Sequence, residues 1–163
     1  MEKWDAYNEN GEIVAGELVR DNPIPKGLYH LVSEVLLKHI DGDYLIVQRD
    51  FNKQVWGGYF EATAGGSALK GETAMDAAKR ELFEETGINA TLFSEIGKLV
   101  TDNTIFASYI AICDSPKDSV ILQKGETISY KWITKKELIT FLNSDECIPS
   151  QRDRILEHIM SNE

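Results

Sequence analysis

The feature that most constrains the fold is a helix signal over residues 73–86 with a clear start and a clear end. Thr73 is a plausible N-cap residue, and Asp76, three residues later, makes an acidic variant of the capping box. Gly87 is placed to end the helix in a left-handed conformation. Apolar residues recur at helical spacing inside the segment, so we expect one face of this helix to pack on a core.

An acidic cluster adjoins that apolar face. At about 100° per residue, Glu81, Glu84 and Glu85 share one arc of roughly 100°. Acidic groups in a last helical turn oppose the helix dipole at about 0.3 to 1 kcal/mol each, and like charges about 4 Å apart repel by up to a few kcal/mol. A pair of Arg80 with Glu84 returns only about 0.3 to 0.5 kcal/mol. A solvated acidic face is the ordinary alternative. A hard divalent cation such as Mg²⁺ would relieve the repulsion, with the Gly65 carbonyl as a further oxygen ligand.

The spacing of this segment carries a resemblance to a known family. The order is Gly66, five residues, Glu72, seven residues, Arg80-Glu81-Leu82, one residue, Glu84-Glu85, one residue, Gly87-Ile88. It resembles the Nudix box at every specified position, which argues against the solvated face. The resemblance implies an α/β fold, an α/β/α sandwich around a mixed β-sheet. It also implies hydrolysis of a diphosphate linked to another moiety, assisted by Mg²⁺ or Mn²⁺.

The resemblance also implies roles for individual residues. Glu81, Glu84 and Glu85 look like the metal-binding and base-supplying carboxylates, with Glu81 the expected base. Arg80 resembles the residue that orients the catalytic glutamate. Glu72 looks like a residue that stabilises the loop before the helix and touches a metal directly or through water.

A second likeness is to the branch that includes isopentenyl-diphosphate isomerase. It rests on Trp4-Asp5, the Gly11 turn, residues 27–30 and residues 130–132. Where that enzyme has a cysteine and a metal-binding histidine, this chain has Gly65 and Ser67, and its Nudix box is complete. We therefore expect phosphoanhydride hydrolysis, with isomerase activity on prenyl diphosphates and a non-catalytic nucleotide-binding module as the alternatives.

Two further residues line up with ligands in that branch. His30 aligns with a metal ligand, although a structural role is the commoner one for a lone histidine at the start of a strand. Glu126 aligns with a ligand carboxylate and competes with Glu81 as the base, while a solvated loop acid is its ordinary interpretation.

The sequence gives less information about the part of the substrate beyond the diphosphate. Trp56, Tyr59, Phe60 and Trp132 are candidates to stack a base, and core or surface packing is their alternative. Arg49 and Lys53 are candidates to neutralise phosphate charge, with surface solvation as the alternative. We expect a nucleoside diphosphate linked to another moiety, such as an ADP-ribose-like molecule or a nucleotide sugar.

Composition limits the partners. The 163 residues carry a formal charge of −10, which disfavours bulk nucleic acid and anionic membranes. No apolar run approaches a membrane span, and Cys113 and Cys147 form no disulfide or zinc pattern. These features indicate a cytoplasmic protein with a small-molecule diphosphate as its partner, and a homodimer is an open possibility.

The chain is expected to form a single domain. Residues 1–28 are predicted to be a β-hairpin extension, packed on the domain and built around a two-residue turn at Asn10-Gly11. Residues 29–163 are predicted to be the Nudix hydrolase domain. Strands are expected near residues 30–38, 44–49, 59–63, 91–100, 104–113 and 128–133, and further helices near residues 135–142 and after Pro149.

Overall fold

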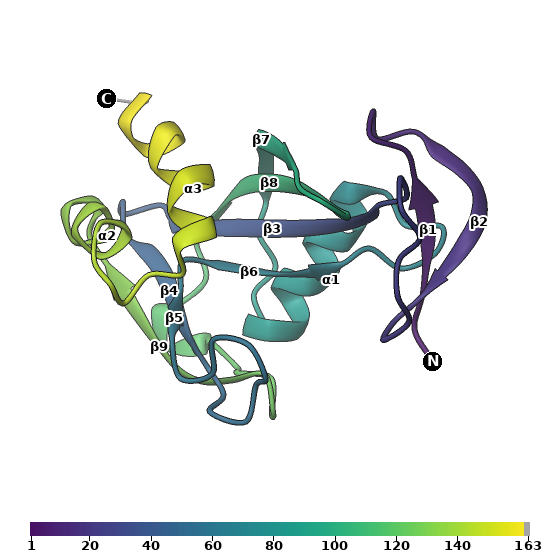
Figure 1. Cartoon of the computed structure of the whole chain (residues 1–163). Helices are drawn as coiled ribbons and strands as arrows, with labels where there is room; N and C mark the ends of the chain where they lie inside the picture. The colour runs from purple at the N-terminus through teal and green to yellow at the C-terminus, as the bar shows by residue number, and fades with distance from the viewer. Residues whose placement is uncertain (162–163) are drawn as a thin grey trace.

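The computed structural model describes residues 1–161, and Figure 1 shows its elements. The strands are β1 (Lys3–Tyr7), β2 (Ile13–Val19), β3 (His30–His39), β4 (Tyr44–Arg49), β5 (Phe60–Glu61), β6 (Thr63–Ser67), β7 (Leu92–Val100), β8 (Thr104–Cys113) and β9 (Thr127–Ile133). The helices are α1 (Ala74–Thr86), α2 (Lys135–Leu142) and α3 (Pro149–Ser161), with a short 3₁₀ turn, η1, at Lys117–Ser119.

The main sheet is mixed. Its strand order is β5-β4-β3-β8-β7, with β6 also paired to β3 and β9 to β4. Strands β3 and β8 run parallel, and the other pairs are antiparallel. The pairing of β3 with β4 is limited to Lys38 and Tyr44, so β6 rather than β4 lies beside the first half of β3. This arrangement leaves the β4–β5–β9 strands free to diverge from β6.

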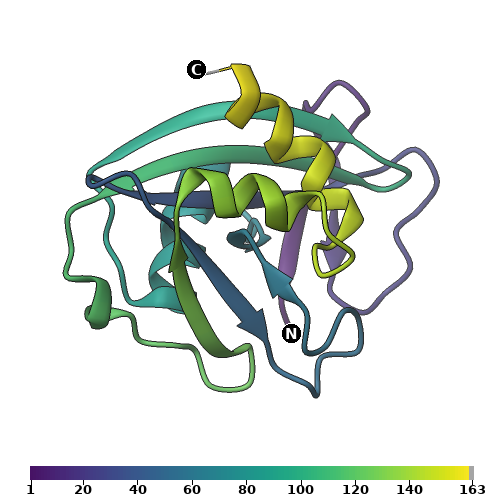
Figure 2. The ribbon, with the colours of Figure 1, turned by 90° about the vertical axis from the view of Figure 1, so that its left-hand side faces the viewer.

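Helices cover both faces of the sheet. Because side chains alternate along a strand, Val35 and Leu37 of β3 point to the core that includes Leu82 of α1. Leu36 of β3 points to the opposite core, which Leu138 of α2 shares with residues of α3. Figure 1 shows α1 and α3 on opposite sides of β3, and Figure 2 shows α2 and α3 together on one face. The predicted α/β/α sandwich is confirmed.

Helix α1 begins and ends as its sequence indicates. Thr73 Oγ1 accepts a hydrogen bond from the backbone N–H of Asp76, and the Asp76 side chain accepts one from the backbone of Thr73. Gly87 has φ +70° and its N–H donates to the Phe83 carbonyl. These two caps fix the direction in which the last-turn glutamates leave the helix.

The hairpin at the amino terminus has a longer turn than expected. Tyr7 pairs with Ile13, so residues 8–12 form the loop and the predicted two-residue turn is wrong. The Asn8 side-chain oxygen accepts hydrogen bonds from the backbone of Asn10 and Glu12, which stabilises the wider loop. Tyr7 also exchanges two backbone hydrogen bonds with Tyr29, and these attach the hairpin to the start of β3.

Most other boundaries fall within a residue of expectation, but the strand expected at residues 59–63 does not. It is replaced by the short β5 and by β6, which continues through Gly65 and Gly66 to Ser67. Gly65 lies opposite Glu34 of β3, and a Cβ on Gly65 would come within 2.4 Å of the Ser33 carbonyl oxygen. Glycine therefore allows close strand pairing here rather than a loop.

Pro149 begins α3, a position that suits its fixed φ and missing N–H. The last two residues of the predicted domain, Asn162 and Glu163, lie outside the described residues. Among residues 1–161, no helix is long and apolar enough to cross a membrane.

Candidate active site

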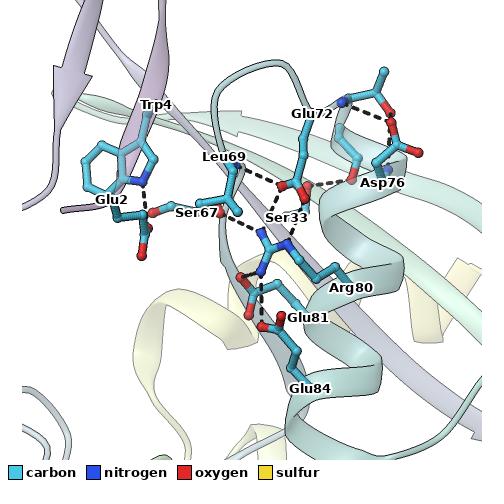
Figure 3. A network of polar contacts seen from close by, with 12 residues as sticks. Glu2, Trp4, Ser33, Ser67, Leu69, Glu72, Asp76, Arg80, Glu81 and Glu84 are labelled. Carbon is cyan, nitrogen blue, oxygen red and sulfur yellow. Dashed lines mark hydrogen bonds and ion pairs between the residues drawn. The ribbon is translucent and has the colours of Figure 1, made fainter.

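Arg80 of α1 joins the loop before the helix to the helix itself. Its Nε donates to Glu72 Oε1 at 2.7 Å and its Nη2 donates to Glu72 Oε2 at 2.9 Å, a two-point contact (Figure 3). Glu72 Oε2 also accepts from the Leu69 backbone N–H at 2.8 Å. The Arg80 contact is the main reason that the pKa of Glu72 is lowered. Glu72 therefore holds residues 69–72 against α1.

The same guanidinium contacts two glutamates of the cluster. Arg80 Nη1 donates to Glu81 Oε1 at 2.6 Å and to Glu84 Oε2 at 3.2 Å, while Nη2 also donates to the Ser67 carbonyl at 3.1 Å. The hydrogen bond to Glu72, and after it the one to Glu81, raises the pKa of Arg80 further above its already high value. Arg80 stays charged and fixes the orientation of Glu81, the residue next to it in the chain.

Glu81 lies directly against the glycine pair of β6. A Cβ on Gly66 would lie 2.5 Å from Glu81 Oε1, which is shorter than the contacts that Cβ atoms make in proteins. Burial raises the pKa of Glu81, although the Arg80 contact acts in the other direction. The absence of a side chain at Gly66 therefore makes room for a half-buried carboxylate.

Glu85 has the least favourable environment for a charged carboxylate in the cluster. Burial, and after it the charges of Glu61 and Glu81, raise its pKa well above the usual range, with a smaller contribution from Glu126. A backbone hydrogen bond from Gly65 acts in the opposite direction. Acids from α1, β5 and the loop before β9 are thus close enough for their charges to act on Glu85.

Two of the acids around the cluster already have cationic partners. Lys53 forms an ion pair with Glu126, and the backbone N–H of Asp50 donates to the Glu126 carbonyl at 2.8 Å. Arg49 Nη1 donates to Glu61 Oε1 at 2.5 Å. The end of β4 and the loop after it therefore supply both predicted phosphate-binding cations, Arg49 and Lys53, and each is bound to a carboxylate.

The aromatic residues that are candidates to stack a base do not all lie together. Arg49 and Trp56 line one cavity of about 170 Å³ that also touches Gly65. Phe60 lies at another surface, where Lys131 Nζ is 4.5 Å from its ring centroid. Tyr59 packs edge-on against Trp56 at a centroid distance of 5.0 Å. The structure therefore brings Arg49 and Trp56 together and leaves Phe60 apart from them.

Trp132 and His30 have protein partners in this structure. Trp132 Nε1 donates to the Lys117 carbonyl at 2.9 Å. The His30 ring stacks on Trp4 at 4.5 Å between centroids, and its Nε2 lies 2.8 Å from Thr104 Oγ1. His30 thus joins β3 to β8 and to the hairpin, which matches its structural interpretation.

Three residues near the cluster are not among the site residues that the sequence predicts: Glu61, Glu34 and Arg154. Glu34 interrupts an otherwise apolar run, and a charge inside a buried strand demands a partner. That signal was available, but the identity of the partner was not, because Arg154 lies 120 residues further along the chain. Glu61 follows an aromatic pair and gave no signal of its own.

The donor set suits a hard divalent cation in chemistry and in charge. The oxygens on offer are those of Glu81, Glu84 and Glu85, with the backbone carbonyl of Gly65 as a further one. The crowding that raises the pKa of Glu85 is what a cation would relieve. Within residues 1–161, no three acidic, histidine or cysteine side chains are grouped tightly enough to hold an ion as they stand. Glu81 and Glu84 instead form ion pairs with Arg80.

An α/β/α sandwich with a capped glutamate helix placed against a Gly-Gly strand defines a class of hydrolases that act on diphosphates. The NUDIX domain model matches residues 29–157, and the chain belongs to this family. It is a hydrolase of pyrophosphate bonds in small-molecule diphosphates, and enzymes of this family generally need a divalent metal.

Relatives from bacteria support the assignment. An uncharacterized Nudix hydrolase of Listeria monocytogenes is 37% identical over 151 residues, covering 91% of this chain and 89% of the relative. One from Pseudomonas aeruginosa is 30% identical over 123 residues, covering 76% of this chain and 73% of the relative.

Solved structures share the fold. A protein of Deinococcus radiodurans has a TM-score of 0.69 at 22% identity, covering 85% of this chain and 87% of its own. A MutT protein of Methanosarcina mazei has a TM-score of 0.65 at 20% identity, covering 83% and 96%.

Proposed function

We propose that the chain hydrolyses the P–O–P bond of a nucleoside diphosphate linked to a second moiety, with Mg²⁺ or Mn²⁺ bound by the α1 carboxylates. The observation that carries this proposal is the contact between Gly66 and Glu81. Position 66 of β6 has no side chain, and the Glu81 carboxylate lies where a side chain would otherwise be. A merely solvated acidic face would need no such space.

Individual residues have separate tasks in this proposal. Glu81, Glu84 and Glu85 hold the cation together with the Gly65 carbonyl, and Glu72 holds the loop that precedes the helix. Arg80 is a positioning residue, since its contact with Glu81 sets the direction of that carboxylate. When bound, the cation supplies charge neutralisation for the phosphates and a lowered pKa for water.

The reaction adds the oxygen of one water molecule to one phosphorus. The P–O bond to the bridging oxygen breaks, and the second phosphate leaves with that oxygen. Glu81 accepts the proton of the water in our proposal, because it is half-buried and its pKa is raised toward the working range of a base. Glu126 is the competing base, but Lys53 already neutralises it in this structure.

A substrate panel tests the proposal. Nucleotide sugars, ADP-ribose, dinucleoside polyphosphates, nucleoside triphosphates and prenyl diphosphates are each assayed with Mg²⁺ and with Mn²⁺. We expect metal-dependent release of two phosphate-bearing products from a nucleoside diphosphate derivative. Isomerisation of a prenyl diphosphate without phosphate release would contradict the proposal, and so would tight nucleotide binding without any product.

A further inference from the structure

A cavity lies between β6 and α3, next to residues that interact with the acidic cluster. It has a volume of about 170 Å³, and Gly65 of β6 and Glu61 of β5 both line it. Gly65 touches the acidic cluster through its hydrogen bond to Glu85, and the charge of Glu61 acts on Glu85 as well. A substrate whose diphosphate lies at the cluster would therefore place its next group at this cavity.

The charges that line the cavity are balanced. Among the described residues around it, the charged ones are Arg49, Glu61, Arg154 and Glu34. Arg49 is paired with Glu61. Arg154 donates from Nε and Nη2 to the two carboxylate oxygens of Glu34, at 2.5 Å and 2.8 Å. With each cation matched to an anion, the cavity favours a neutral group over a further phosphate or an ammonium group.

Arg154, which lines this cavity, has one hydrogen-bond donor without a partner. The Arg154 side chain is only 7% exposed, and its Nη1 is buried without a hydrogen bond. The guanidinium also lies over the Phe106 ring, 4.2 Å from its centroid, so the group is held in place on two sides. Buried donors are nearly always satisfied, and an unpaired one on a cavity-lining residue needs an explanation. A ligand oxygen would supply the missing acceptor.

Size limits the group that fits. Pockets for whole drug-sized ligands have volumes of about 300 to 1,000 Å³, so this cavity suits a single ring rather than a complete nucleoside. Trp56 forms part of the wall and supplies an aromatic face for such a ring. Because Nη1 is covered by protein in this structure, ligand entry must shift neighbouring side chains, as is common at binding sites.

We propose that this cavity binds the part of the substrate beyond the diphosphate, a neutral single ring with an acceptor oxygen, and that Arg154 is its specificity residue. The inference rests on the proposed function, because the ring is placed by the diphosphate. A one-ring base with a carbonyl and a sugar ring with hydroxyls share this chemistry. A prenyl chain, which has no acceptor, does not.

The test uses Arg154→Lys, which keeps a positive charge beside Glu34 but removes the guanidinium and with it Nη1. KM and kcat are measured with Mg²⁺ for the terminal methyl esters of UDP and CDP, which have a base but no second ring beyond the diphosphate, and for UDP-glucose and ADP-ribose. Ethyl diphosphate, used as a competitive inhibitor, provides a reference without a ring. We expect KM to rise about tenfold for the ring-bearing substrates, while kcat and the inhibition constant of ethyl diphosphate stay unchanged. A rise with the methyl esters of UDP or CDP identifies the base as the ring, and a rise confined to UDP-glucose and ADP-ribose identifies the sugar.

Control variants keep the result interpretable. Arg152→Lys on the exposed side of α3 should leave both constants at wild-type values. If Arg154→Lys fails to fold by circular dichroism, the charge-balanced pair Glu34→Gln with Arg154→Met replaces it. An unchanged KM, or an equal change in KM and in the inhibition constant of ethyl diphosphate, would overturn the inference while wild-type turnover upholds the proposed function. If the wild type hydrolyses none of the substrates, the proposed function fails and this inference fails with it.

Discussion

Gly66 and Glu81 are in contact in a way that no other residue at position 66 would allow. A Cβ at position 66 would lie 2.5 Å from Glu81 Oε1 and 2.7 Å from Glu81 Cδ. The neighbouring atoms belong to the end of a flexible side chain, so a methyl group there would displace the carboxylate rather than the strand. The contact links the paired glycines of β6 to the chemistry of α1.

The first prediction is that Gly66→Ala separates activity from folding. The displaced Glu81 carboxylate should lower kcat by about a hundredfold, since small misplacements of catalytic groups cost about that much. The melting temperature should fall only slightly. Gly97→Ala in β7 is the matched control, because a Cβ there meets nothing within 4 Å. Full activity in Gly66→Ala would show that the position of Glu81 is unimportant.

The second prediction concerns Arg80, whose guanidinium makes five hydrogen bonds to Glu72, Glu81, Glu84 and the Ser67 carbonyl. Arg80→Lys keeps the charge but cannot make the two-point contact with Glu72. We expect a loss of about 1 to 3 kcal/mol in the free energy of unfolding and a lower kcat. Chemical denaturation and steady-state kinetics measure the two effects. A variant that loses neither would remove Arg80 from its positioning role.

The third prediction is that the Glu85 carboxylate lowers the stability of the metal-free protein but is required for hydrolysis. Because burial and neighbouring acids raise its pKa, the folded protein binds more protons here than the unfolded chain above the usual carboxyl value of 4.5. This group therefore makes the metal-free fold less stable as pH rises through that value. Glu85→Gln should remove that penalty, so the metal-free variant should be more stable than wild type at neutral pH.

Its measurement is a pair of denaturation series without metal, at about pH 5 and about pH 8. The stability advantage of Glu85→Gln should grow with pH, and its hydrolytic activity should be lost. Glu95→Gln on the exposed part of β7 is the control and should show neither effect. Wild-type turnover in Glu85→Gln would contradict the assignment.

The fourth prediction follows from the two candidate bases. Glu126→Gln removes a carboxylate that is already paired with Lys53, so we expect a modest rise in KM and an unchanged acidic limb of the pH–kcat/KM profile. Glu81→Gln should abolish that limb along with most of the activity. The opposite pattern in the two variants would transfer the role of base to Glu126.

The fifth prediction concerns the buried cysteine Cys147. Burial raises the pKa of Cys147 to about 11, so its thiol stays protonated at neutral pH. Alkylation by iodoacetamide should therefore be much slower in the folded protein than in the unfolded chain. Equal rates, followed by mass spectrometry, would show that the thiol is accessible and ionised.

Local signals made much of the fold readable from the sequence. The caps at Thr73 and Gly87, together with the spacing of the glutamates between them, define α1 without any knowledge of the rest of the chain. The strand at residues 104–113 has its predicted bounds, because a long apolar run buried on both faces leaves few alternatives.

Features that depend on distant contacts were not readable. The Gly65-Gly66 pair has the composition of a loop, and only its pairing with β3 makes it a strand. The partner of Glu34 comes from the opposite end of the chain. Whether Trp56 or Phe60 reaches the cavity depends on how the β4–β5 loop turns, which spacing alone does not encode.

The most direct test of the central claim is hydrolysis in ¹⁸O-labelled water with Mg²⁺, followed by ³¹P NMR and mass spectrometry. Attack of water on phosphorus predicts one ¹⁸O atom in one of the two phosphate-bearing products and none in the other. The incorporation should require the metal and should disappear in Glu85→Gln. Product formation without ¹⁸O on phosphorus, or label incorporation that persists in Glu85→Gln, would contradict the account.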